Sequence, residues 1–156
     1  MRSLSVQATA GKSTPVLATR ADRAEANGME SLVAESIIRW FLPETIALDT
    51  WCVRYARACV RRARVEDWAA AWRAMSKLDC LDRLHEIDVP VMSLSGRQDA
   101  SSTTPMMKAI AEACRDGIGE FVEVDPGTHM MAMESSGAVA KELLKFRAKV
   151  DAAARV

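Results

Sequence analysis

One segment decides the fold of this chain: Asp88-Val89-Pro90-Val91-Met92-Ser93-Leu94-Ser95-Gly96. A proline stands near its start, a glycine ends it, and the residues between them are apolar or small, which predicts a β-strand bounded by turns. Such continuous apolar character is typical of a strand buried on both faces, as in a parallel sheet. We therefore expect this segment to lie inside a sheet that is covered by helices.

The segments around this strand alternate between strand and helix patterns. The expected elements are, in chain order, a strand at 3–8, a short helix at 78–84, the strand at 88–96, a helix at 104–114, a turn at 116–119, a strand at 120–124 and a closing helix at 137–148. Strands and helices that alternate in this way form parallel strands joined by right-handed crossovers. The sequence therefore predicts an α/β architecture.

The stretch between the first two of these strands contains helix patterns and no strand pattern. Asn27-Gly28 is expected to end one helix, and Leu42-Pro43 to end a second helix that begins at Met29. We therefore predict three parts: a first strand and loop of the core at 1–15, a helical insertion at 16–77, and the remainder of the α/β core at 78–156.

Two helices of the insertion each allow two interpretations. Between residues 50 and 65, four arginines are expected on the face opposite the apolar residues: Arg54, Arg57, Arg61 and Arg64. This face could bind an acidic or membrane surface, but the expectation is a solvated face whose arginines pair with neighbouring acids. Trp68 and Trp72 share one helix face, where core packing is the expectation and ligand stacking the alternative.

Composition and charge exclude several classes of protein. The 156 residues include 21 Lys plus Arg and 21 Asp plus Glu, and this zero net charge argues against a nucleic-acid partner. Because no apolar run approaches the roughly 20 residues of a membrane span, and no secretory signal is recognisable, we expect a cytoplasmic protein without a membrane partner. The four cysteines form no CxxC pair and the two histidines are not spaced with them as ligands, so neither a metal nor a cofactor is expected.

Two polar loops carry the candidate chemistry. Gly96-Arg97-Gln98-Asp99 follows one predicted strand and Pro126-Gly127-Thr128-His129 follows the next. Because ligands of open α/β sheets bind beyond the carboxyl ends of the strands, Asp99 and His129 are expected on the binding side. Asp99 would orient the His129 imidazole as a general base, which is two thirds of a catalytic triad. The alternative is that Asp99 only forms a turn and His129 is an ordinary loop histidine.

These loops, together with Asp125 and Met133-Glu134, resemble the C-terminal part of the α/β-hydrolase fold. The segments from Met29 to Arg39-Trp40-Phe41-Leu42-Pro43, at Asp67-Trp68-Ala69 and at Leu81-Asp82-Arg83-Leu84 are similar to the cap and return helix of 3-oxoadipate enol-lactonases and related lactone or ester hydrolases. The resemblance covers nearly the entire chain. It implies a partial α/β-hydrolase fold, with its last three parallel strands, their flanking helices and a helical cap.

The resemblance also implies an activity. Enzymes of this family hydrolyse a small-molecule lactone or ester with a Ser-Asp-His triad, in which Asp99 would orient the base and His129 would be the base. Trp40 and Trp72 would be cap residues that contact substrate. Arg39 and Arg73 are candidate partners of a substrate carboxylate, although ion pairs within the cap are the expectation for both.

The sequence departs from the family at the nucleophile. The Gly-x-Ser-x-Gly turn needs two glycines four residues apart, and no two of the seven glycines have that spacing. We therefore expect little activity from the chain alone, and an open sheet edge along the strand at 3–8. Two hypotheses follow: a C-terminal part of a hydrolase that needs a complementing N-terminal half, or a non-catalytic protein derived from a hydrolase. The second would form a homodimer or bind a partner through the sheet edge or the arginine-rich helix.

Overall fold

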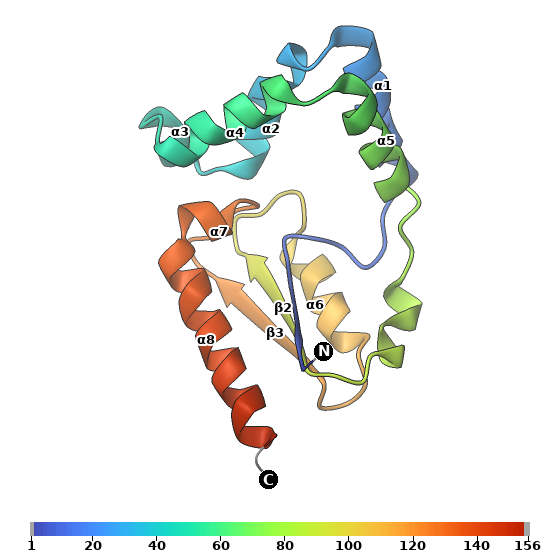
Figure 1. Cartoon of the computed structure of the whole chain (residues 1–156), viewed down its shortest axis with the longest axis vertical. Coiled ribbons are helices and arrows are strands. Elements are labelled where there is room, and N and C mark those ends of the chain that lie inside the picture. The colour runs from blue at the N-terminus through green and yellow to red at the C-terminus, as the bar shows by residue number, and fades with distance from the viewer. Residues whose placement is uncertain (1, 155–156) are drawn as a thin grey trace. The chain divides into compact units, whose positions relative to one another are not determined.

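The computed structural model describes residues 2–154 and divides the chain into two compact units (Figure 1). The α/β unit consists of the segment up to Gly11 and the segment from Cys80 onward, and the helical unit consists of Lys12–Asp79. Among the described residues, no helix combines the length and the apolar character that crossing a membrane requires.

The α/β unit is built on a three-stranded parallel sheet in the order β1-β2-β3. Its elements are, in chain order, β1 (Leu4–Gln7), the 3-10 helix η3 (Leu81–Glu86), β2 (Val91–Gly96), α6 (Thr104–Glu112), β3 (Gly119–Val124), α7 (Met131–Glu134) and α8 (Ser136–Ala153). The three parallel strands and their connecting helices confirm the predicted α/β class.

The central strand β2 is buried along its whole length, as its apolar sequence predicts. Its side chains alternate between the two faces of the sheet. Met92 and Leu94 belong to a core cluster that also includes Phe146 of α8. On the other face, the hydroxyl of Ser93 donates a hydrogen bond of 2.6 Å to the carbonyl of Met107 in α6. The small serine therefore allows α6 to pack closely, and the strand ends that carry the candidate loops are held from both sides.

The helical unit contains, in chain order, η1 (Pro15–Leu17), α1 (Ala18–Asn27), η2 (Glu30–Leu32), α2 (Val33–Trp40), α3 (Pro43–Ala47), α4 (Trp51–Arg62) and α5 (Val65–Met75). Helices α1 and α5 pack against each other through small residues, with Ala21, Ala24 and Ala69 buried. Gly28 ends α1 with a φ of 71°, a left-handed conformation that favours glycine. The prediction that Asn27-Gly28 ends a helix is confirmed.

Some predicted helix boundaries were wrong. Residues 78–80 are not helical, because Asp79 forms an antiparallel bridge with Lys12, and the helical turn there spans only Leu81–Glu86. The prediction that Leu42-Pro43 ends a helix is confirmed, since α2 stops at Trp40, and Pro43 also opens α3, where its missing N–H costs nothing. The closing helix is longer than predicted and is preceded by the short α7, which the sequence analysis did not anticipate.

The arginine-rich helix α4 has the solvated face that was expected for Arg54, Arg57 and Arg61, whereas Arg64 lies beyond its end and directly precedes α5. Arg61 makes two hydrogen bonds of 2.8 Å to the carboxylate of Glu30, and the side chain of Arg57 bonds to Asp49. Val53 and Val60 are buried on the opposite face. These exposed pairs contribute little stability, but they neutralise much of the basic face.

Candidate active site

The two candidate loops leave the carboxyl ends of the neighbouring strands β2 and β3. Gly96 and Gly127 lie back to back where the loops meet: a Cβ atom on Gly96 would lie 2.6 Å from the carbonyl carbon and oxygen of Gly127. Only glycine allows the two backbones to approach this closely. The contact places the first residues of one loop directly beside the histidine-bearing segment of the other.

Asp99 is held rigidly inside its loop. Its side chain is 0% exposed. One carboxylate oxygen, Oδ1, accepts hydrogen bonds from the backbone N–H groups of Ser101 at 2.7 Å and Ser102 at 3.0 Å. A carboxylate buried in this way needs further hydrogen bonds to compensate for lost water. These bonds fix the orientation of the carboxylate, and its second oxygen, Oδ2, requires a hydrogen-bond donor of its own.

The imidazole of His129 is the partner of this second oxygen. Its Nδ1 lies 3.0 Å from Asp99 Oδ2, and its side chain is 24% exposed. The structure thus brings together the two residues that the sequence analysis selected, 30 positions apart in the chain. The imidazole is fixed by the buried carboxylate on one side, while part of the ring reaches the surface.

The two loops are joined by side chains that the sequence pattern does not single out. The backbone N–H of Gln98 donates a hydrogen bond of 2.8 Å to the Gly127 carbonyl, and its side-chain Oε1 accepts one of 2.8 Å from the Gly127 N–H. The side-chain Nε2 of Gln98 donates a third, of 3.0 Å, to the Asp125 carboxylate. Arg97 adds an ion pair of 2.9 Å to the same Asp125 carboxylate. The Gln98 hydrogen bond, with the Arg97 charge and hydrogen bond behind it, lowers the pKa of Asp125. Arg97, Gln98 and Asp125 stand in or beside the two predicted loop segments, but their spacing in the sequence does not show that they pair with one another.

A second set of hydrogen bonds fixes the far side of the histidine loop. The buried Thr128 hydroxyl donates to the carboxylate of Glu134 in α7, and the Ser135 hydroxyl donates to the Pro126 carbonyl at 2.8 Å. The short helix α7 therefore closes back on the loop. These hydrogen bonds anchor the residues that precede His129 to the residues that follow it, which restricts the backbone from which the imidazole extends.

The predicted cap residues all lie in the helical unit. Trp72 packs edge-on against Trp68, with ring centroids 6.1 Å apart, and the guanidinium of Arg39 lies 5.7 Å from the ring of Trp40. Arg73 is neutralised by Glu25 at 2.6 Å and by a further aspartate, which confirms the expected ion pair within the helices. The substrate contacts of Trp40 and Trp72 remain predictions.

Comparisons with known proteins find a distant relative in sequence and similar folds among solved structures. No protein-family model matches the chain. A stretch of 84 residues, 54% of the chain, is 29% identical to 3-oxoadipate enol-lactonase 1 of Acinetobacter baylyi and corresponds to 32% of that protein.

Solved structures match nearly the whole chain. The enol-lactonase from Burkholderia xenovorans LB400 superimposes with a TM-score of 0.88 at 23% identity, covering 95% of this chain and 56% of that one. A thermophilic esterase from Thermogutta terrifontis superimposes with a TM-score of 0.82 at 23% identity, covering 95% of this chain and 56% of the esterase. A hydrolase from Pseudomonas aeruginosa PA01 superimposes with a TM-score of 0.83 at 21% identity, covering 93% of this chain and 55% of the hydrolase. The chain therefore spans little more than half the length of the solved structures that it matches.

Proposed function

We propose that Asp99 and His129 are the acid and base of a Ser-Asp-His triad that hydrolyses a lactone or carboxylic ester, because part of the sequence is similar to an enol-lactonase and the fold matches that of another. The observation that carries this proposal is the 3.0 Å contact between His129 Nδ1 and a fully buried carboxylate oxygen of Asp99.

The proposed roles follow from the geometry. The Asp99 carboxylate keeps the ring proton on Nδ1, so Nε2 is the nitrogen that accepts a proton from the attacking hydroxyl. Asp99 also stabilises the imidazolium that forms. His129 then returns the proton to the leaving oxygen, and the same cycle hydrolyses the acyl intermediate with water.

The serine of this triad would come from a complementing N-terminal half, because this sequence contains no Gly-x-Ser-x-Gly turn. The sheet has a place for such a segment. Within residues 2–154, β1 pairs only with β2, so its other edge can accept a further parallel strand. The side chains of β1 are partly exposed.

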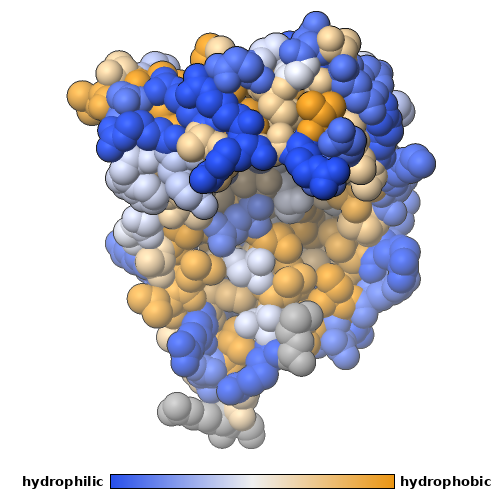
Figure 2. Space-filling model, turned by 45° about the horizontal axis from the view of Figure 1, so that its top comes forward, coloured by the Kyte–Doolittle hydropathy of each residue, from blue (hydrophilic) through white to orange (hydrophobic). Residues whose placement is uncertain are grey.

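The same edge supports a second candidate function, a non-catalytic protein that forms a homodimer through β1. Figure 2 shows hydrophobic side chains, in orange, on the visible face of the α/β unit in the lower part of the view. An unpaired strand beside apolar surface favours edge-to-edge association. The arginine-rich helix is a weaker candidate interface, because its arginines pair with acids of the same unit.

Hydrolysis of p-nitrophenyl acetate tests the proposal. The chain is assayed alone and after co-expression with the part of the Burkholderia enol-lactonase that it does not match, and each size-exclusion peak is sized by light scattering. We expect activity in the complemented sample, and His129→Ala should abolish it. The matched control is His85→Ala, which removes the exposed second histidine and should change nothing.

The possible outcomes separate the candidates. Complementation that restores turnover dependent on His129 supports the triad. A stable dimer without turnover, alone or complemented, refutes the triad and supports association through the sheet edge. Turnover that persists in His129→Ala refutes the assigned base.

A further inference from the structure

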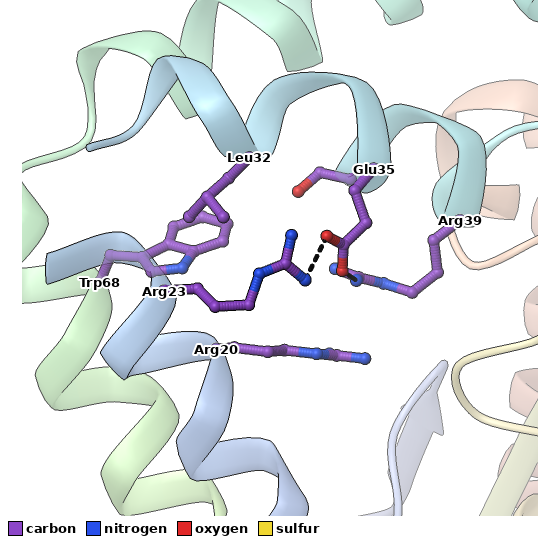
Figure 3. A pocket seen from close by; sticks show the side chains of 7 residues that line it. Arg20, Arg23, Leu32, Glu35, Arg39 and Trp68 are labelled. Atoms are coloured by element: carbon purple, nitrogen blue, oxygen red, sulfur yellow. Dashed lines mark hydrogen bonds and ion pairs between the residues drawn. The ribbon is translucent and has the colours of Figure 1, made fainter. Parts of the chain in front are cut away.

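A cluster of three arginines surrounds one carboxylate in the helical unit. Arg20 and Arg23 lie three residues apart on α1, and Glu35 and Arg39 lie four apart on α2, so each pair shares one helix face. Figure 3 shows the three guanidinium groups gathered around the Glu35 carboxylate. Trp68 of α5 lines the same recess.

The single carboxylate is already used by two of the three arginines. Glu35 pairs with Arg23 at 2.6 Å and with Arg39 at 3.4 Å. Arg20 forms no ion pair with any residue between 2 and 154. Its guanidinium instead lies 4.4 Å from the centroid of the Trp72 ring, a cation–π contact that fixes the side chain without neutralising its charge.

The surroundings of Arg20 and Trp68 favour a ligand that accepts hydrogen bonds. The pKa of Arg20 is lowered, chiefly by burial; the Glu35 carboxylate opposes this effect and the Arg23 charge adds to it. The nearby negative charge therefore does not fully offset the burial of the Arg20 cation. The indole Nε1 of Trp68 is buried and has no hydrogen-bond partner among the described residues. Arginine and tryptophan side chains only donate hydrogen bonds, so the ligand that suits them must accept.

We propose that this recess, formed by Arg20, Arg23, Arg39 and Trp68 around Glu35, binds the carboxylate group of a small organic acid. A carboxylate supplies two acceptor oxygens in the planar arrangement that a guanidinium fork matches. The recess holds about 10 Å³, room for one water-sized group. One carboxylate oxygen therefore enters the recess, and the second oxygen and the rest of the molecule lie at its opening.

This site stands independently of the proposed hydrolase activity. All of its residues belong to the helical unit, and none belongs to the Asp99 or His129 loops. The site selects ligands by charge and planarity, and binding can be measured without turnover. Failure of the ester assay therefore leaves the site unaffected, and failure of the site leaves the triad unaffected.

The test follows the Trp68 indole N–H by NMR in the ¹⁵N-labelled full chain, with the signal assigned by its loss in Trp68→Phe. Sodium acetate at pH 7 is the probe, and sodium chloride at equal ionic strength is the comparison. We expect a saturating shift with acetate, at least fivefold weaker apparent affinity in Arg20→Gln, and unchanged affinity in Arg64→Gln. Arg64→Gln removes one positive charge, as Arg20→Gln does, but at an exposed side chain outside the recess.

Other outcomes overturn the proposal. A shift that rises linearly, an equal shift with chloride, or undiminished acetate affinity in Arg20→Gln would each show that no carboxylate site exists. If Arg20→Gln loses the fold by circular dichroism, Arg20→Lys decides, because it keeps the charge and removes the planar fork. Weaker acetate binding by Arg20→Lys supports the site, and unchanged binding refutes it.

Discussion

Substitution of Gly96 by alanine tests whether the close approach of the two loops holds the site together. The added Cβ would lie 2.6 Å from Gly127 backbone atoms and 2.7 Å from the Thr128 carbonyl oxygen, where ordinary contacts begin at 3.4 Å. The obstructing atoms are backbone and cannot rotate away. The histidine loop must therefore retreat by about 0.8 Å, the difference between 3.4 and 2.6 Å.

The cost of that retreat can be estimated from the contacts it disturbs. Overpacking of a filled interior costs about 1–3 kcal/mol. The retreat also stretches the two hydrogen bonds of 2.8 Å between Gln98 and Gly127, each of which contributes about 1 kcal/mol. We expect Gly96→Ala to lower the free energy of unfolding by about 3–5 kcal/mol. It should also lengthen the 3.0 Å contact between Asp99 and His129.

Urea unfolding measures the effect. With an m value of about 2 kcal/mol/M, the midpoint should fall by about 1.5–2.5 M. Gly137→Ala is the matched control, since it makes the same chemical change inside α8 where nothing lies within 4 Å of the added Cβ. It should stabilise the helix by up to about 1 kcal/mol. A Gly96→Ala midpoint within about 0.3 M of the unchanged chain would refute the argument that backbone contact holds the loops together.

Three further substitutions test other parts of the structure. The Gln98 hydrogen bond and the Arg97 charge hold the pKa of Asp125 below its ordinary value, so the stability it contributes is present above about pH 4 and is lost as the pH falls through the lowered value. Asp125→Asn should therefore flatten the acid limb of a pH–stability profile, while Asp116→Asn should not. Leu94→Ala should cost about 2–5 kcal/mol in chemical denaturation, whereas Leu144→Ala, at a side chain 64% exposed, should cost almost nothing. Gly28→Ala, at a φ of 71°, should lower the thermal midpoint by several degrees, corresponding to about 1 kcal/mol.

Elements with strong local signals were predictable from the sequence. The strand that became β2 was bounded by Pro90 and Gly96, and the end of α1 by Gly28. Proline and glycine restrict or free the backbone at their own positions, so their effect does not depend on distant contacts. Helix and strand periodicity likewise depends on residues within a few positions.

Elements that depend on distant partners were not predictable. Residues 78–80 carry a helix pattern, yet Asp79 pairs with Lys12, 67 positions earlier in the chain, and the strand bridge prevails. Distant partners also decide the hydrogen bonds of Gln98 to Gly127 and Asp125. The same holds for the arginines around Glu35. Each partner is an ordinary polar residue, and only packing selects which polar residues meet.

The sequence by itself determined the order of the three strands and of the longer helices, and it placed Asp99 and His129 after neighbouring strands at one edge of the sheet. The tertiary structure decided that the carboxylate and the imidazole meet at 3.0 Å and that glycines 96 and 127 allow the loops to touch. It also decided that Arg20 is left without a carboxylate partner. The physical reason is range: backbone preferences act between residues close in sequence, whereas hydrogen-bond geometry and charge balance depend on residues that folding brings together.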